Sequence, residues 1–180
     1  MKTARLIIAL LIFTSISGCA MDEKKLSDDQ GRKTIVTMDQ AITEYLENSI
    51  IPILPPPGVK TFAAYDLLGV SENGDEKTAY MLADIWTYGV EPSVGIGPRS
   101  ASFLPLALIL REENGGFTVV GHRQPRDGSN NWPDIKQIFP EEYHERILDY
   151  HKTGKGQEME QSIRERVNNY LKTVGIENTV

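Results

Sequence analysis

The residues best suited to chemistry lie in one stretch, residues 121–134 (GHRQPRDGSNNWPD). It holds an imidazole, two guanidinium groups, two carboxylates and an indole, set among residues that favour turns. A histidine beside a carboxylate could act as a general base, and two arginines could bind an anionic ligand through paired hydrogen bonds. The candidate binding surface consists of His122, Arg123, Arg126, Asp127, Trp132 and Asp134.

A structural interpretation of the same stretch is favoured over a binding one, and catalysis comes last. Residues 125–128 (PRDG) have the composition of a tight turn, because proline presets φ and glycine completes the turn. Asp134, three positions before Gln137, could cap the next helix, and Trp132 could cover the end of a sheet. We therefore assign no catalytic residue.

Two carboxylates stand inside otherwise apolar strand segments, Asp66 and Asp84. Burial would raise the pKa of either one and mark a site, although exposure or pairing with an arginine is the commoner outcome. For metals, the three histidines lack the close spacing of known ligand pairs. We expect no metal and no cofactor.

The elements that must position these groups are an N-terminal helix and four strands. Thr37 and Gln40 have the spacing of a capping box, and apolar residues follow at three- and four-residue steps. Strands are expected at about 60–70, 77–89, 101–112 and 117–122. Hairpin turns are predicted at residues 73–74 (NG) and 114–116 (NGG).

The third strand is apolar on both faces, which predicts a central strand covered on both sides. Pro105 argues against that position, since a proline in mid-sheet loses a ladder hydrogen bond. In the second strand, one face carries Ala79, Met81, Ala83 and Ile85, and the other carries Tyr80, Leu82, Trp86 and Tyr88. These aromatic residues are expected to pack under a helix, the alternative being a ligand cup.

The C-terminal part is predicted to form two helices, at about 140–150 and 157–173, each with one apolar stripe. The fold class is therefore α+β: an N-terminal helix, a four-stranded antiparallel meander sheet and two C-terminal helices. This order resembles cystatin-like and NTF2-like folds, which include binding modules and enzymes. An NTF2-like ligand-binding protein or hydrolase-like enzyme would place its pocket near Asp84, Trp86, His122 and Asp127.

The N-terminus has a positive start, a short apolar run and small residues before Cys19, the features of a secretory signal. The apolar run is shorter than the roughly 20 residues of a membrane-spanning helix. Ile16-Ser17-Gly18-Cys19 resembles the lipobox of bacterial lipoproteins. That resemblance implies a signal peptide at 1–18 and lipidation of Cys19, the chain's single cysteine. Residues 19–33 are polar enough to be a flexible tether, and 34–180 form one domain.

Charge narrows the expected partners. Removal of residues 1–18 takes away two basic residues and no acidic one, which leaves 17 basic against 25 acidic residues and a net charge of −8. An acidic body of this kind argues against binding to nucleic acid. The expected membrane contact is lipid on Cys19, on the extracytoplasmic side of a bacterial envelope. Ala20 is not the aspartate of a retention signal, which favours the outer membrane in a cell with two membranes.

The body of the chain also resembles uncharacterised lipoproteins of bacterial envelopes. The resemblance is carried by residues 66–69 (DLLG), 125–129 (PRDGS), 134–136 (DIK) and 138–140 (IFP). It implies no activity and transfers no site residue. We therefore expect a lipid-anchored envelope protein, non-enzymatic, that binds another envelope protein or a small ligand.

Overall fold

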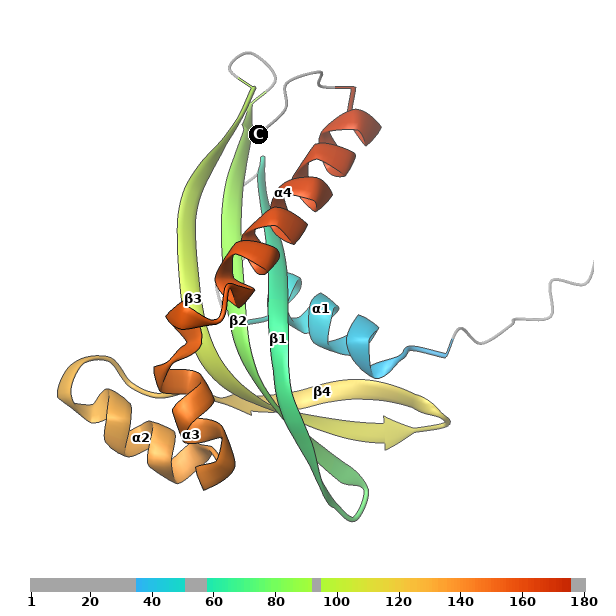
Figure 1. The fold of residues 1–180 in the computed structure, drawn as a ribbon. Helices are drawn as coiled ribbons and strands as arrows, with labels where there is room; N and C mark the ends of the chain where they lie inside the picture. Colours follow the sequence, from blue (N-terminus) through green and yellow to red (C-terminus); the bar gives the residue numbers. More distant parts are fainter. Residues whose placement is uncertain (1–34, 51–57, 92–94, 176–180) are drawn as a thin grey trace, which may run out of the picture. The chain divides into compact units, whose positions relative to one another are not determined.

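The domain is a four-stranded antiparallel sheet with helices on both faces (Figure 1). The computed structural model describes residues 35–50, 58–91 and 95–175, all within a compact unit that begins at Thr34. The predicted signal peptide, Cys19 and the tether at 19–33 lie outside the described residues.

The order of elements confirms the predicted α+β fold. Helix α1 (Met38–Asn48) precedes strands β1 (Val59–Asn73), β2 (Glu76–Glu91), β3 (Gly95–Glu113) and β4 (Gly116–Arg123), which pair in sequence order. The two predicted C-terminal helices are α3 (Glu141–Leu148) and α4 (Lys155–Thr173). A further short helix, α2 (Asn131–Ile138), stands before them, and 3₁₀ turns cover Gly128–Asn130 and Tyr150–Lys152.

Helix α1 begins with the predicted capping box. The Gln40 amide donates to Thr37 Oγ1 at 3.2 Å, and the Thr37 amide donates to Gln40 Oε1 at 2.9 Å. These two bonds satisfy donors that the first turn of a helix otherwise leaves unpaired. The helix then buries Ala41, Ile42 and Leu46 against the sheet.

Strand alternation divides the core into two layers, as the sequence of β2 predicts. The α1 side of the sheet buries small and aliphatic residues of β2 and β3: Ala79, Met81, Ala83, Ile85, Leu106, Leu108 and Leu110. The opposite side packs Tyr80, Leu82 and Tyr88 against α2, the residues after α3, and α4, with contributions from Ile135, Phe139, Tyr150, Met159, Ile163, Val167 and Leu171. The aromatic residues of β2 therefore lie under helices, as expected.

Pro105 is tolerated in the central strand β3 because β4 does not extend as far as this residue. Pro105 pairs with Leu82 of β2, whereas the pairing of β3 with β4 begins only at Ala107 opposite Arg123. The outer edge of β3 is therefore free of β4 at Pro105, and a missing amide costs nothing on a free edge. Further along β3, Leu106, Leu108 and Leu110 are fully buried.

Candidate functional site

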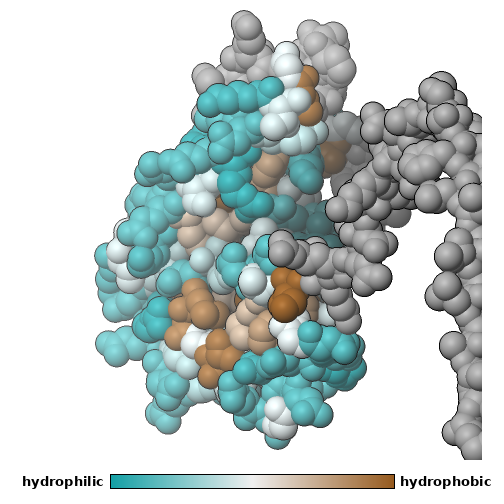
Figure 2. All heavy atoms as spheres, turned by 90° about the vertical axis from the view of Figure 1, so that its right-hand side faces the viewer, coloured by the Kyte–Doolittle hydropathy of each residue, from teal (hydrophilic) through white to brown (hydrophobic). Residues whose placement is uncertain are grey.

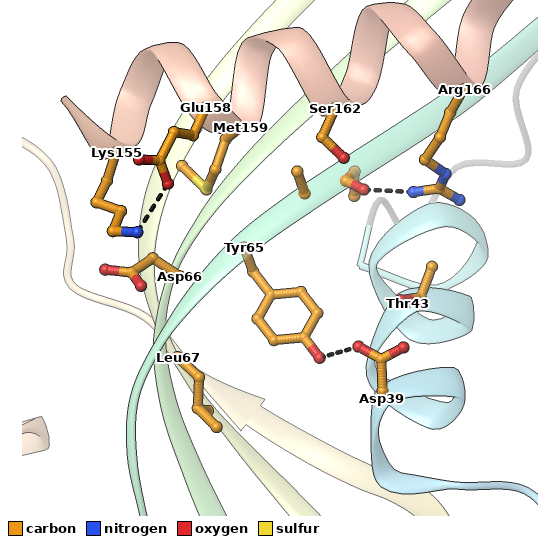
Figure 3. Close-up of a pocket in the computed structure, with 12 residues that line it drawn as sticks. Asp39, Thr43, Tyr65, Asp66, Leu67, Lys155, Glu158, Met159, Ser162 and Arg166 are labelled. Atoms are coloured by element: carbon orange, nitrogen blue, oxygen red, sulfur yellow. Dashed lines mark hydrogen bonds and ion pairs between the residues drawn. The ribbon is translucent and has the colours of Figure 1, made fainter.

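A groove runs along the outer edge of β1, between α1 and α4 (Figure 3). Strand β1 is an edge strand, because the sheet order is β1-β2-β3-β4. The groove encloses a volume of about 450 Å³. Its floor is the segment from Ala63 to Leu67, and its two walls come from helices that lie on opposite faces of the sheet. We call this feature the β1-edge groove.

One end of the groove is closed by an ion pair that takes the place of a neighbouring strand. Glu47 of α1 accepts a hydrogen bond from the Ala63 amide at 3.0 Å, and Arg166 of α4 donates to the Ala63 carbonyl at 2.5 Å. The two side chains also pair with each other, Arg166 Nη2 to Glu47 Oε1 at 2.6 Å. Both outward main-chain groups of Ala63 are therefore satisfied by side chains.

Beyond the other end of the floor, a residue of α3 caps the main chain of β1. Arg146 donates through Nη1 to the Leu68 carbonyl at 3.0 Å and lies 3.5 Å from Asp66 Oδ2 through Nη2. Leu68 is the extra residue of a bulge between Leu67 and Gly69, so its carbonyl turns out of the β1–β2 ladder. Asp66 thus has the arginine partner that the sequence analysis favoured.

Between these two ends, β1 presents unpaired main-chain groups. In an antiparallel pair, alternate residues direct both their amide and their carbonyl away from the partner strand. Ala63, opposite Ile85, is one of them, so Tyr65 opposite Ala83 and Leu67 opposite Met81 are the next two. Within the described ranges, no residue hydrogen-bonds the main chain of Tyr65 or Leu67 across this edge.

The walls of the β1-edge groove differ in chemistry. On the α1 side, the Tyr65 hydroxyl donates to Asp39 Oδ1 at 2.5 Å; burial, followed by the bond to this carboxylate, raises the pKa of Tyr65. On the α4 side, Lys155 and Glu158 form an ion pair at 2.7 Å beside Met159 (Figure 3). The groove thus combines main-chain donors and acceptors with apolar surface and a tyrosine-bound carboxylate.

Apolar surface is also exposed on β1 itself. Leu67 is 40% exposed and Val70 is 38% exposed. Figure 2, which faces the side of the domain on the right of Figure 1, shows apolar surface gathered in the lower half of this face and bordered by hydrophilic surface. This part of the domain therefore offers contacts for an apolar as well as a polar ligand.

Within the predicted surface at residues 121–134, the strongest contacts are internal and connect the two ends of the loop. Arg126 forms a two-point ion pair with Asp134, Nε to Oδ2 at 2.7 Å and Nη2 to Oδ1 at 2.8 Å, and its amide donates to the same carboxylate at 2.9 Å. These bonds lower the pKa of Asp134 to about 2. Asp134 lies inside α2, so it closes the loop and does not cap the helix. Asp127 is exposed and precedes the 3₁₀ turn without a side-chain capping bond.

Of the other predicted residues of this surface, His122 and Trp132 contact separate elements, and Arg123 is exposed. His122 Nδ1 lies 2.7 Å from the hydroxyl of Tyr45 on α1, which fastens that helix to β4. Trp132 packs edge-on against His144 and under the Lys136 ammonium group, and Arg123 is exposed at the end of β4. The six residues therefore do not converge on one ligand.

The alternative pocket near Asp84, Trp86, His122 and Asp127 is not formed, because these residues do not share one face of the sheet. Asp84 and Trp86 hydrogen-bond each other at 2.8 Å on the face that α4 covers, whereas His122 contacts α1 on the opposite face. The sheet itself separates them, because successive residues of a strand alternate between its two faces. Burial raises the pKa of Asp84, and the nearby charge of Glu160 adds to that effect.

Two further cavities are present in the described part of the domain. One, of about 460 Å³, lies beside the start of α4 and is lined by Phe103, Ile147, Tyr150 and Glu160, among others. The other, of about 250 Å³, lies between α1 and β4. The buried hydroxyls of Tyr88 and Tyr150 have no partner among the described residues, and burial raises the pKa of Tyr150 to about 12.

Neither a metal site nor a membrane span is found among the described residues. No group of three or more histidine, cysteine, aspartate or glutamate side chains there could hold a metal ion. None of the helices in those ranges has the length and apolar character needed to cross a bilayer.

Comparison with protein-family models, curated protein sequences and solved structures gave no significant match. The β1-edge groove is the feature that sequence reasoning missed. Its key groups, Glu47, Tyr65 and Arg166, come from three separate segments and form no motif. The sequence carries no signal that marks this edge, because the exposure of Leu67 becomes visible only in the structure.

Proposed function

We propose that this chain is a bacterial envelope protein anchored by lipid on Cys19, and that its domain is a non-enzymatic binding module. The observation that carries the binding role is the β1-edge groove. Among the described residues, the outward main-chain groups of Tyr65 and Leu67 on its floor have no partner, although residues on either side of them are capped. Such groups are available for recognition of another molecule.

The disposition of the polar side chains supports a binding role over a catalytic one. A general base needs a free position next to the substrate proton that it removes. His122 is engaged with Tyr45, His144 with the Phe139 carbonyl, and Asp134 with Arg126. These groups serve to connect elements of the domain.

The anchor is supported by the sequence and tested by a fatty-acid label. We expect wild-type cells grown with labelled palmitate to label the protein, and Cys19→Ala to abolish the label and release the chain from the membrane fraction. Several acyl chains on one residue give stable anchoring, which explains why a single substitution is enough. A wild-type chain that takes up no label would contradict the anchor.

The binding role is tested by site-specific photo-crosslinking in cells. A photoreactive amino acid placed at Leu67, in the groove, should give a discrete cross-linked product. The same residue placed at Leu148, which is 55% exposed on α3 and does not line the groove, is the matched control. Absence of a product at Leu67, or identical products at both positions, would contradict a binding function for the groove.

A further inference from the structure

We propose that the β1-edge groove receives an extended peptide segment of a partner protein, which adds to the sheet beside β1 and carries a lysine or arginine opposite Asp39. This inference rests on the proposed binding function and gives the ligand its chemical class. Three features of the groove support it: the pattern of capped and open residues along β1, the position of the two helical walls, and the pairing of the charged side chains that line it.

The capping pattern indicates recognition through the main chain. An exposed edge strand is a template for pairing with another chain, and proteins usually block it. Here the Glu47–Arg166 pair blocks Ala63 and Arg146 blocks Leu68, yet nothing in the described part of the chain hydrogen-bonds the main chain of Tyr65 or Leu67 along this edge. The open interval fits a short extended peptide, which would exchange main-chain hydrogen bonds with both residues. Addition of a strand to a sheet edge is an established mode of peptide recognition.

The walls favour a single strand over a second copy of this domain. Residues of α1 and α4 line the groove on the two faces of the sheet, so both helices extend beside the β1 edge (Figure 3). A second copy would bring its own α1 and α4 to the same edge, together with its own Glu47–Arg166 pair. A lone peptide brings neither, and a volume of about 450 Å³ suits a few residues of it.

The charges of the lining predict a basic residue in the peptide. Lys155 is paired with Glu158, and Arg166 is paired with Glu47. Asp39 accepts a hydrogen bond from Tyr65, but no cation among the described residues pairs with it. A lysine or arginine at the matching position of the peptide would supply that cation, and an acidic residue there would be repelled.

The test uses the full-length chain in detergent and three fluorescein-labelled peptides. The first is Thr-Val-Thr-Lys-Thr-Val-Thr with blocked ends, the second carries glutamate in place of lysine, and the third is the lysine peptide N-methylated at its third and fourth residues. N-methylation at two successive positions removes a donor from each edge of the strand without changing any side chain. Binding is measured by fluorescence anisotropy, and amide hydrogen exchange is followed by NMR.

We expect the lysine peptide to bind at least tenfold more tightly than the glutamate peptide and the N-methylated peptide not to bind. The amides of Tyr65 and Leu67 should become protected from exchange when the lysine peptide binds. Equal binding by the lysine and N-methylated peptides would overturn strand addition. No binding of the lysine peptide up to about 1 mM would overturn the inference as a whole.

Two substitutions in the chain refine the test. Leu67→Pro removes an outward amide and no bond of the β1–β2 ladder, so it should weaken peptide binding at least tenfold, whereas Leu67→Ala keeps the amide and should weaken it less. Asp39→Asn should remove the preference for lysine over glutamate. If Leu67→Pro fails to fold, the N-methylated peptide still decides the question.

The outcome can be separated from that of the proposed function. A cross-linked product at Leu67 in cells together with failure of the lysine peptide would leave the binding module standing and reject the extended basic peptide. Absence of both would reject both proposals.

Discussion

Several polar side chains of this domain hydrogen-bond the main chain. Asp134 accepts a bond from the Arg126 amide, Glu47 accepts one from Ala63, and Arg146 and Arg166 each donate to a carbonyl of β1. Aspartate, glutamate and arginine are residue types that enzymes use in catalysis. Here they hydrogen-bond the main chain of a loop and of an edge strand. The type of a residue therefore predicts its capacity for chemistry, while the partner that the fold supplies decides its role.

The Arg126–Asp134 pair should make stability depend on pH in acid. Because the folded state lowers the pKa of Asp134 to about 2 from its ordinary value of 3.8, the ionised carboxylate stabilises the fold above about pH 4. This contribution is lost as the pH falls through about 2. We expect Asp134→Asn to lower the urea midpoint of unfolding at pH 6 and to match wild type near pH 2.

The control for this prediction is Asp127→Asn, which changes an exposed carboxylate in the same loop with no side-chain capping bond. It should leave the urea midpoint unchanged at both pH values. A pH profile of Asp134→Asn parallel to that of wild type would contradict a stabilising role for the ionised pair.

Asp84 should behave in the opposite sense. Burial raises the pKa of Asp84, so the folded state favours the protonated form and the ionised form costs stability at neutral pH. Asp84→Asn keeps an acceptor for the Trp86 indole and removes the repulsion from Glu160. We expect it to raise the free energy of unfolding at pH 7 by up to about 1 kcal/mol, since the group is half-buried and partly screened.

The advantage of Asp84→Asn should disappear below the ordinary pKa of an aspartate, where Asp84 of the wild type is protonated in both the folded and the unfolded state. Urea unfolding at pH 7 and at pH 3 measures the difference. A loss of stability at pH 7 would show that the negative charge at Asp84 supports the fold.

At the scale of elements, the edge of β1 joins helices that lie on opposite faces of the sheet. Glu47 of α1 is 11% exposed in its side chain, and Arg166 of α4 is 37% exposed. Glu47→Ala removes both the acceptor for Ala63 and the partner of Arg166, so we expect a loss of about 1–3 kcal/mol in the free energy of unfolding. Glu47→Gln retains an acceptor and should lose less.

Glu76→Gln is the matched control for Glu47, because the Glu76–Arg111 pair has a similar distance, 2.9 Å, but both side chains are about half exposed. An exposed pair of this kind contributes about 0–1 kcal/mol. Chemical denaturation of the three variants gives the comparison. Equal decreases in the free energy of unfolding for Glu47→Ala and Glu76→Gln would show that the contact at the β1 edge stabilises the domain no more than an exposed ion pair does.

The elements were predictable where the pattern is local. One of the two predicted hairpin turns is displaced by one residue, because β1 continues through Asn73 and the turn consists of Gly74 and Asp75. The capping box of α1, the two faces of β2 and the second hairpin turn depend on residues close together in the chain, and the structure confirms them. Asn114 and Gly115 indeed adopt positive φ, 55° and 79°. Helix α2 was not predicted as a separate element; Pro133 lies in its first turn, where a proline is tolerated.

The β1-edge groove and the separation of His122 from Asp84 were not predictable in the same way. The first depends on contacts between α1, β1 and α4, which no single stretch encodes. The second depends on the register of β4, where shifting the pairing by one residue would turn His122 to the other face. The β-bulge between Ile109 and Leu110 sets that register, and alternation of residue types does not reveal it.

At the scale of the whole domain, both core layers share one sheet, so they should unfold together. Leu46 is fully buried on the α1 side, and Ile163 is fully buried on the α4 side. Both tryptophans pack on the α4 side, Trp86 near α4 and Trp132 near α3, so tryptophan fluorescence reports that layer. Far-ultraviolet circular dichroism reports all elements.

We expect Leu46→Ala and Ile163→Ala each to lower the free energy of unfolding by about 2–5 kcal/mol, because each leaves a cavity in a close-packed layer. The exposed control Leu148→Ala should change it by less than about 0.5 kcal/mol. The informative variant is Leu46→Ala, whose side chain is separated from both tryptophans by the sheet. If the sheet couples the layers, its fluorescence and dichroism transitions shift together. A fluorescence transition that stays at the wild-type midpoint while the dichroism transition moves would show that α1 detaches alone, and the groove wall carrying Asp39 would then be independent of the α4 wall.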